Sequence, residues 1–409
     1  MCKVLKRSIL AASVAAVLFT GAGRLYADGD FFNVSATGSG GTTLSVNGSN
    51  VINLADNLIN EDKQFSTLSG QNISASVTYG GVANALIFTE NSGATSATLT
   101  IPSTGFTKTF TGTDSADLQQ QIKNFLKTDA SSAYAQFLEE MDKLSPVATL
   151  DGNPQASTAL IADSAFSRFG LENRQLTEYK RLGDSAYFDV AVDGGTSRAS
   201  GLDGTWAQLD LETGVRFTDF LALSLATDLD YRNVAGAAAY TVDEQLGLPI
   251  TFINNKGDGF SWQVTPWAFA GLSASYDEVA GSVLVGGGGT SSLAFHLGTL
   301  TLTLGDQISY NGDVPVNVDG YGFDTVINQW IVKNGLDANF RFPGTPFFID
   351  GSVAYTDFVR KAAVPDYITP GIGFGLAFGS ASSLRFGYTG DFAKRYNANG
   401  GEVTLVISY

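Results

Sequence analysis

The last ten residues, Gly400-Gly401-Glu402-Val403-Thr404-Leu405-Val406-Ile407-Ser408-Tyr409, decide the fold of this chain of 409 residues. Large apolar side chains recur there at every second position up to the terminal tyrosine. Successive side chains of a β-strand point to opposite faces, so this spacing predicts a strand with one apolar face. Residues 382–392 repeat the alternation, and it continues back to about residue 186. A single hairpin would also suit a soluble sandwich, but the repetition favours a barrel.

The amino terminus has the pattern of a secretory signal peptide. Basic residues at positions 3, 6 and 7 precede an apolar run over residues 9–19, which is too short to span a bilayer as a helix. We expect cleavage after Ala27, with cleavage after Gly23 as the alternative. Removal of residues 1–27 takes away the only cysteine and four of the 24 Lys and Arg, so 40 acids face 20 bases and the charge becomes −20.

This composition excludes several classes of protein. The negative charge argues against nucleic acid and anionic lipid as partners. Without cysteine, an exported chain must be stabilised by sheet pairing and burial rather than by disulfides. No later run reaches 18 uninterrupted apolar residues, so the sequence predicts no transmembrane helix. A membrane form of this chain would therefore be a closed barrel, because open sheet edges leave backbone groups unsatisfied in lipid.

Two regions precede the predicted barrel. Residues 28–112 are rich in Ser, Thr, Gly and Asn and predict a small polar β region of six to eight strands. Residues 113–180 change to the helical period and predict a cluster of three short amphipathic helices, a linker or plug. Thr113 or Asp114 would cap the first helix, and Ser145-Pro146 would close the second. Asn153-Pro154 would begin the third, which should run to Gly170.

Residues 181–409 predict an all-β transmembrane barrel of about twelve antiparallel strands. The expected strands are 186–195, 205–217, 220–231, 240–253, 261–276, 281–297, 299–310, 323–342, 346–358, 367–379, 382–392 and 400–409. Connections from even to odd strands are mostly tight, and those from odd to even strands are mostly long. Short turns at one end, longer loops at the other and an even strand number are typical of outer-membrane barrels.

Some positions do not fit this pattern. Asp306 and Asn334 fall on the face expected to contact lipid, the run Gly286 to Gly289 interrupts the sixth strand, and strand 323–342 is long. A bulge, a protruding strand or an extra hairpin would each account for them, so fourteen strands remain an alternative to twelve.

The order of signal peptide, exported region, helical segment and carboxy-terminal barrel resembles the autotransporter family. The terminal Val403-x-Leu405-x-Ile407-x-Tyr409 resembles the targeting strand of outer-membrane proteins in general. The resemblance implies that the barrel lies in the outer membrane of a Gram-negative-type cell, where the barrel-assembly machinery and lipid are its partners. It also implies that a helix threads the pore and that the front region is displayed outside. The chain departs from the family in its compact barrel and in lacking long repetitive strands in residues 28–112.

Catalytic and metal chemistry find little support. His296 is the only histidine, and alternation places it on the lumen face as a structural residue. Gly183-Asp184-Ser185 resembles the start of a lipase block, but Leu293 stands where the Asp of an Asp-x-x-His base would be needed. The glycines at 286–289 lack the lysine of a phosphate loop. Asp313, Asp319 and Asp324 fit no calcium-loop spacing. We expect no enzyme activity, no cofactor and no zinc.

The inward face is predicted to be acidic. Its candidate lining residues are Asp189, Asp193, Asp210, Glu212, Arg216, Asp228, Asp230, His296, Lys333, Asp337, Asp350, Arg385 and Asp391. An open pore with this lining would favour small cations. Alternatively, Arg216 and Arg385 knit the acids into a network that fills the barrel.

Two functions follow from this architecture. The leading hypothesis is a non-enzymatic outer-membrane barrel that anchors or displays its amino-terminal region. The alternative is a narrow, porin-like, cation-preferring diffusion channel with the helical segment as plug. The ligand of residues 28–112, the side of the membrane they occupy and the oligomeric state stay open.

Overall fold

The computed structural model describes residues 30–49, 66–68, 70–128, 130–171, 186–254, 259–278, 280–314, 316–318, 321–323, 326–378 and 382–408. The expected signal peptide, the Gly183-Asp184-Ser185 block and Tyr409 lie outside this part of the chain. So do Asp319 and Asp324 of the loop considered for calcium.

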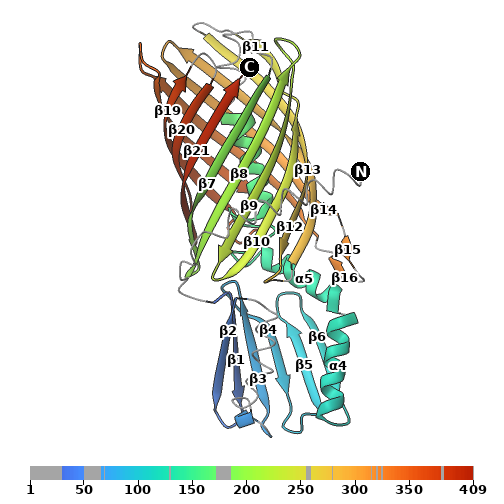
Figure 1. Cartoon of the computed structure of the whole chain (residues 1–409). Coiled ribbons are helices and arrows are strands. Elements are labelled where there is room, and N and C mark those ends of the chain that lie inside the picture. Colours follow the sequence, from blue (N-terminus) through green and yellow to red (C-terminus); the bar gives the residue numbers. More distant parts are fainter. Residues whose placement is uncertain are drawn as a thin grey trace.

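A small sheet forms the amino-terminal region, and it lies at one end of the barrel (Figure 1). Its six antiparallel strands have the order β2-β1-β3-β4-β5-β6. They are β1 (Phe32–Gly38), β2 (Thr43–Gly48), β3 (Ile73–Tyr79), β4 (Val82–Glu90), β5 (Ser96–Ile101) and β6 (Phe106–Thr111). Helix α4 (Ser115–Thr128) packs on β5 and β6 through a cluster that contains Phe110 and Phe125.

The N-terminus of α4 is capped as the sequence predicts. The Asp117 backbone N–H donates to the Asp114 carboxylate over 2.9 Å, and the Asp117 carboxylate accepts from the Thr113 backbone N–H over 2.9 Å. This reciprocal exchange resembles a capping box, which satisfies helix donors that have no intrahelical partner. The hydrogen bond from Thr113 also lowers the pKa of the exposed Asp117 carboxyl.

Twelve antiparallel strands close into a barrel, because the last strand pairs with the first. The strands are β7 (Ala186–Ala199), β8 (Leu202–Arg216), β9 (Ala222–Val234), β10 (Ala237–Gly247) with its continuation β11 (Ile250–Asn254), β12 (Gly259–Ser275), β13 (Ala280–Leu297), β14 (Leu300–Val314), β17 (Asn328–Arg341), β18 (Phe347–Phe358), β19 (Asp366–Phe378), β20 (Ser382–Ala393) and β21 (Tyr396–Ser408). Strands β10 and β11 both pair with β12, so they count as one interrupted strand. The count is therefore twelve rather than fourteen.

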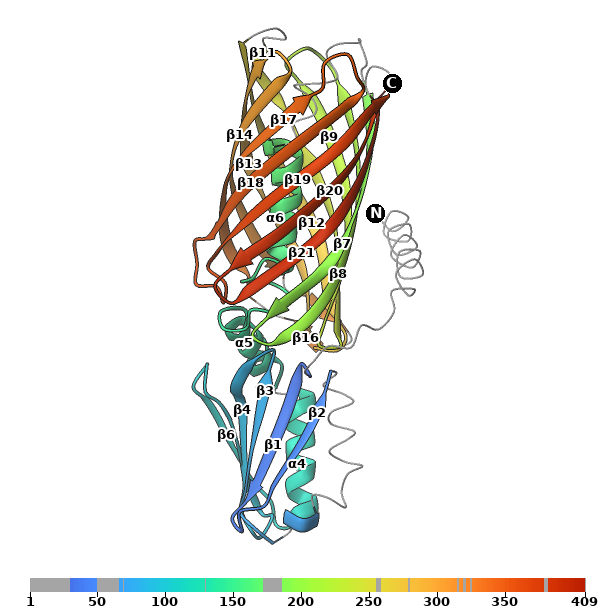
Figure 2. The ribbon, with the colours of Figure 1, turned by 90° about the vertical axis from the view of Figure 1, so that its left-hand side faces the viewer.

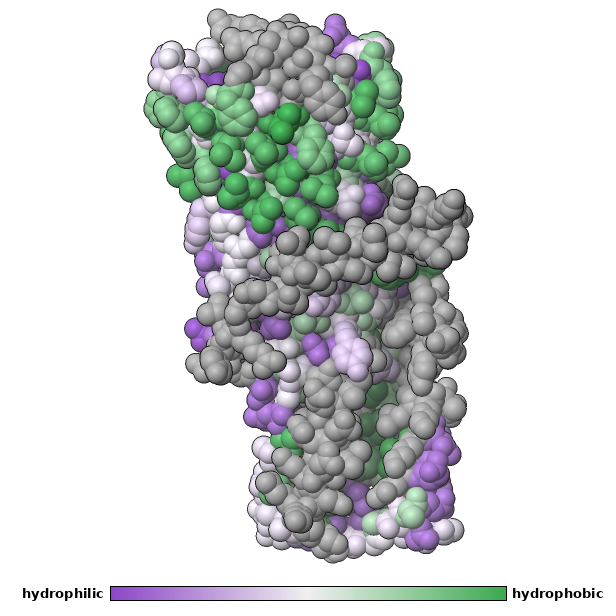
Figure 3. Space-filling model, viewed as in Figure 1, coloured by the Kyte–Doolittle hydropathy of each residue, from purple (hydrophilic) through white to green (hydrophobic). Residues whose placement is uncertain are grey.

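We call the end at which β7 begins and β21 finishes the C-terminal end, and the opposite end, which carries the small sheet, the domain end (Figures 1 and 2). The exterior near the C-terminal end is strongly apolar (Figure 3). Exposed side chains there include Phe188 on β7, Phe374 on β19 and Val403 on β21. The interior positions of the same strands are mostly polar, glycine or alanine, with Val406 as a buried apolar exception. This alternation is the arrangement of a barrel that contacts lipid outside.

The predicted contrast in loop lengths is wrong. The strands extend further than their apolar patterns, so the connections at Ser200 and Gly201, and at Ala235 and Gly236, are two-residue turns. Positive φ angles at all four residues produce these turns. One long connection stays at the domain end, residues 315–327, which includes the hairpin of β15 (Val316–Val318) and β16 (Tyr321–Phe323).

Three further strand assignments need correction. The glycine run does not interrupt a strand, because β13 continues through Gly286 and Gly289 in unbroken register with β12 and β14. The predicted strand 240–253 breaks at Leu248 and Pro249, and the predicted strand 323–342 begins only at Asn328. No bulge turns Asp306 or Asn334 inward, since both pair in regular register and are exposed.

The three predicted helices are present but occupy different places. Helix α5 (Ala130–Asp142) lies between the small sheet and the barrel, and α6 (Ser157–Phe166) lies inside the barrel (Figure 2). The start predicted at Asn153 is four residues too early. Asn153 instead shapes the preceding turn, with its side chain donating to Ala148 O over 2.7 Å and accepting from Gln155 N over 3.0 Å.

Among the described residues, no helix combines the length and the apolar character needed to cross a bilayer.

Candidate functional site in the barrel lumen

Residues 153–171, which we call the plug, occupy the lumen. They comprise the Asn153 turn, α6 and a π-helical turn over Ser167–Leu171. One side of the plug packs on the wall formed by β12, β13, β14 and β17, where Ile161, Ala165 and Phe169 contact Trp267 and Phe269. Because α6 is buried over almost its whole surface, it has no strong amphipathic stripe.

Glycines of the wall make room for the plug. A Cβ at Gly335 would lie 3.0 Å from the Phe166 ring, and one at Gly247 would lie 2.5 Å from the Phe169 ring. At Gly305 a Cβ would lie 3.0 Å from the Gly170 backbone. Inward glycines in these strands therefore mark places where another backbone or ring approaches closely.

Polar wall residues hold the backbone and hydroxyl groups of α6. The Gln307 side-chain amide donates to Ala162 O over 2.8 Å, and the Gln245 amide donates to Ile161 O over 3.2 Å. The Ser157 hydroxyl lies 2.8 Å from the Thr241 hydroxyl and 2.7 Å from the Ser273 hydroxyl. These contacts pair polar groups that would otherwise be buried without partners.

Arg168 is the main electrostatic contact between the plug and the acidic wall. Its guanidinium donates to both carboxylate oxygens of Asp228 and to Gln245 Oε1, the last over 3.0 Å. Asp210 and Glu212 each lie 3.9 Å from the same guanidinium. The Ser164 hydroxyl also donates to Asp228 over 2.7 Å. One plug cation thus serves three wall carboxylates.

Two other cations pair with acids inside the barrel. Lys333 contacts the plug carboxylate of Asp163, which also accepts from the Tyr367 hydroxyl over 3.0 Å. Arg385 links wall residues to each other, donating to Asp350 over 2.7 Å and to Glu402 over 2.5 Å. The second contact joins neighbouring strands β20 and β21. Part of the acid excess is therefore neutralised in place.

A cavity of about 230 Å³ remains beside the plug, on the side opposite its apolar seat. It lies against β7, β8, β9 and β18 to β21. Eight carboxyl side chains and four basic side chains line it, so its wall is predominantly acidic. Phe166 of the plug and Trp206 and Tyr231 of the wall contribute the aromatic part of the lining.

The structure places all thirteen candidate lining residues on the inward-facing set of their strands. Asp189, Glu212, Asp228, Asp230, Lys333 and Asp350 are buried. Asp193, Asp210, Arg216, His296, Asp337, Arg385 and Asp391 are partly buried. Of the targeting-strand residues, Val403, Leu405 and Ile407 are on the outward-facing set.

The structure brings part of this set together: eight of the thirteen line the cavity beside the plug, namely Asp189, Asp193, Asp210, Glu212, Asp230, Lys333, Arg385 and Asp391. Asp210, Glu212 and Asp228 gather around Arg168, whereas Asp350 pairs with Arg385 on the other side of the barrel. His296 lies near the C-terminal end, where its Nε2 is 3.1 Å from the Ser261 hydroxyl. Within the described residues, no group of three or more His, Cys, Asp or Glu could hold a metal ion.

Several important residues were missed by sequence reasoning. Asp163 and Arg168 lie in the plug, and their partners became evident only when the plug was placed in the lumen. Arg232, Asp243 and Glu402 do occupy inward positions of predicted strands or their extensions. Strict counting of alternate positions to the true strand ends would have found these three.

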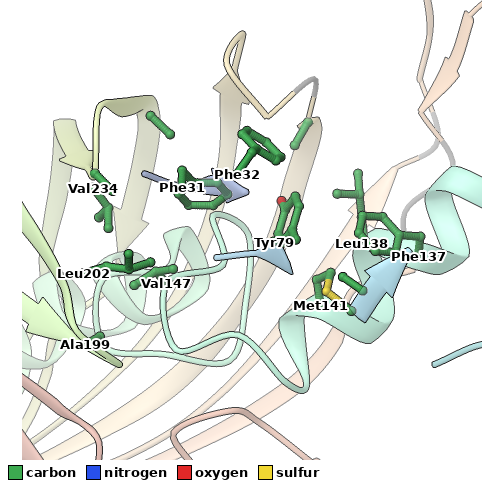
Figure 4. Packing of buried hydrophobic residues seen from close by; sticks show 14 of the residues in the cluster. Phe31, Phe32, Tyr79, Phe137, Leu138, Met141, Val147, Ala199, Leu202 and Val234 are labelled. Carbon is green, nitrogen blue, oxygen red and sulfur yellow. The ribbon is translucent and has the colours of Figure 1, made fainter. Parts of the chain in front are cut away.

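A continuous hydrophobic cluster joins the small sheet to the domain end of the barrel. Tyr79 packs edge-on against Phe31, Phe32 and Phe137 of α5, with ring centroids 5.1–5.4 Å apart, and Phe31 and Phe32 lie tilted at 5.0 Å. The cluster continues into the barrel turns through side chains such as Leu202 and Val234 (Figure 4). Such aromatic pairs add stability beyond the burial of their area.

A buried polar network fixes the same junction. Glu278, in the turn between β12 and β13, accepts from the Tyr79 hydroxyl over 2.8 Å and from the Thr149 hydroxyl over 2.5 Å. Arg232 lies 3.7 Å from Glu278 and donates to the carbonyl oxygens of Val147 and Ala148. Burial raises the pKa of Glu278, and burial together with Glu278 raises the pKa of Tyr79. Arg232 and Glu278 thus hold the connecting segment at Val147, Ala148 and Thr149 against the domain end of the barrel.

No protein-family model matches the sequence, and no curated protein does. Among solved structures, the chain is similar to the translocator domain of the autotransporter NalP from Neisseria meningitidis, with 14% identity, a TM-score of 0.43 and coverage of 62% of this chain and 98% of that one. It is similar to the β domain of the Bordetella autotransporter BrkA, with 11% identity, a TM-score of 0.42 and coverage of 55% and 100%. An outer membrane channel from Pseudomonas putida F1 has 15% identity, a TM-score of 0.39 and coverage of 56% and 97%.

Proposed function

We propose that this barrel anchors the small sheet in the outer membrane and displays it at the cell surface, in the manner of an autotransporter. The observation that carries the proposal is the path of the chain. The small sheet lies at the domain end, the plug runs through the lumen, and β7 then begins at the C-terminal end (Figure 2). The sheet and the end at which β21 finishes therefore lie at opposite ends of the barrel.

One feature supports the outside location of the domain end. The longest connection between neighbouring barrel strands, residues 315–327, is at this end, and longer connections of outer-membrane barrels are typically extracellular. The sheet is docked by an apolar cluster and by the Glu278 network rather than tethered by a free linker. Docking would hold a displayed domain at a fixed height and orientation.

Protease treatment of intact cells tests the orientation. Tags inserted in the β5–β6 turn at Gly105, where a Cβ meets no atom within 4 Å, should be cleaved or labelled from outside. A matched tag at the Gly344 turn, which is equally open but lies at the C-terminal end, should react only after the outer membrane is permeabilised. The reverse pattern would place the sheet in the periplasm and end the display proposal.

The second candidate is a narrow channel that favours cations. Its support is the cavity of about 230 Å³ beside the plug, with eight acids and four bases in its lining. Planar-bilayer recordings test it: stepwise currents with cation selectivity are expected if the plug yields. Silent bilayers at every voltage, or anion selectivity, would exclude this candidate while leaving display untouched.

A further inference from the structure

A row of polar side chains crosses the lipid-facing surface of the barrel. Ser291 on β13, Asp306 on β14, Asn334 on β17 and Tyr355 on β18 are direct register partners, each opposite the next. These strands are neighbours on one side of the barrel (Figure 2). Asp306 and Asn334 are exposed, and neither side chain forms a hydrogen bond or ion pair with any described residue.

The row lies within the apolar belt rather than at its border. Along β14, Asp306 stands between Leu304 and Ile308, which are 43% and 51% exposed. Leu336, two residues from Asn334 on β17, is 41% exposed. The outward residues of β14 run from Leu300 to Tyr310, and ten residues of a strand tilted by 35–45° cover about 25 Å of membrane height. That span matches the apolar band of such barrels, and Asp306 is near its middle.

Both borders of this band carry aromatic pairs. Tyr310 contacts Trp330 toward the domain end, with ring centroids 5.1 Å apart, and Phe340 contacts Phe342 toward the C-terminal end at 5.3 Å. Aromatic girdles mark the two interfaces of an outer-membrane barrel. An unpaired carboxylate and an unpaired amide between them would face hydrocarbon, which offers no hydrogen-bond partner.

We propose that Asp306 and Asn334 form the centre of a symmetric interface with a second copy of this barrel. A twofold axis along the membrane normal, passing between the two residues, brings Asp306 of each copy opposite Asn334 of the other. The amide then donates to the carboxylate at two equivalent places. The carboxylate of one copy therefore faces the amide of the other at both places. A single charged residue at this position would instead face the same charge on the second copy.

The surface around the pair permits close approach. Gly287 and Gly289 on β13 and Ala268 and Ala270 on β12 occupy neighbouring outward positions. A Cβ at Gly289 would meet no atom within 4 Å, so no neighbouring side chain covers the surface at this position. Small residues let two membrane-embedded elements pack backbone to backbone. They support the interface, while the polar pair selects the partner and its register.

The test is the association of the full-length mature protein in nanodiscs and in detergent, followed by light scattering and single-molecule photobleaching. We expect dimers for the wild type. The variant Asp306→Leu with Asn334→Leu replaces two lipid-facing polar groups by apolar ones and should fold at least as well. Loss of two membrane hydrogen bonds should raise the dissociation constant about tenfold or more.

Two controls separate the outcomes. Asp306→Asn keeps a donor and an acceptor at the pair and should stay dimeric. Ile372→Ala with Phe374→Ala changes two lipid-facing residues on β19, away from the pair, and should also stay dimeric. A wild type that is monomeric at every protein-to-lipid ratio overturns the proposal, as does a leucine double variant that dimerises equally well.

Discussion

At the scale of single residues, the junction between sheet and barrel depends on a few buried polar groups. Glu278 is in contact with Tyr79 of the sheet, Thr149 of the connecting segment and Arg232 of the barrel. Asp142, at the end of α5, has its pKa raised well above the ordinary value by burial and by the nearby Asp151. These carboxyl groups make docking sensitive to pH.

The direction of this pH dependence follows from the raised pKa values. A carboxyl group whose pKa is higher in the folded state stabilises that state most when it is protonated, and this contribution is lost as the pH rises through the raised value. Docking should therefore be strongest near or below pH 4.5, the ordinary pKa of Glu278, and weaken at neutral pH. Limited proteolysis of residues 143–152 across this range measures it. Glu278→Gln should weaken the dependence of the proteolysis rate on pH. An unchanged dependence would show that Glu278 is not the group responsible.

A second residue-scale prediction concerns the glycine that receives Phe169. Gly247→Ala places a methyl group 2.5 Å from that ring, so the plug must shift. We expect a loss of about 1–3 kcal/mol of unfolding free energy from overpacking. Denaturant titration of the refolded protein gives the value. Gly401→Ala, whose Cβ would approach no atom closer than 3.8 Å, is the matched control, for which no loss is expected.

At the scale of elements, the plug is held by one strong cation. Replacing Arg168 with Met leaves Asp210, Glu212 and Asp228 near one another without their shared partner. Breaking a buried ion pair in this way costs about 3–5 kcal/mol. The plug should then leave its seat more often, and bilayer recordings should show openings that are rarer in the wild type.

The matched variant for this prediction is Arg198→Met. Arg198 pairs with Asp203 on the barrel exterior, and its side chain is 65% exposed. Exposed pairs contribute about 0–1 kcal/mol, so neither stability nor conductance should change measurably. Equal opening in both variants would show that the plug does not depend on Arg168.

At the scale of the whole molecule, closure depends on β21, because this strand pairs with β20 on one side and β7 on the other. Without it, two long edges would face lipid unpaired. Deletion of residues 396–408 should abolish the change in gel mobility between unboiled and boiled samples that a closed barrel shows. Lys394→Ala, in the exposed turn before β21, should keep that change. A mobility difference in the truncated protein would argue against closure by this strand.

Prediction from sequence succeeded where a local period carries the information. The alternation in residues such as Leu384, Phe386 and Tyr388 predicted both the strand and its outward face, because the side-chain period of a strand is independent of its partners. It failed at the strand ends. Polar residues such as Asn233 and Arg198 continue the sheet beyond the apolar belt, where no hydrophobic pattern marks them.

The sequence alone determined that this chain forms a closed barrel with an apolar exterior and an acidic interior, because both properties depend on the alternation of apolar and polar side chains along each strand. Only the tertiary structure decided what fills that interior and what stays uncovered outside. Arg168 binds Asp228, which is 60 positions away in the sequence, and Asp306 lies opposite Asn334 on the neighbouring strand. Such contacts depend on how the sheet curls around the plug, and no local period of the chain encodes that path.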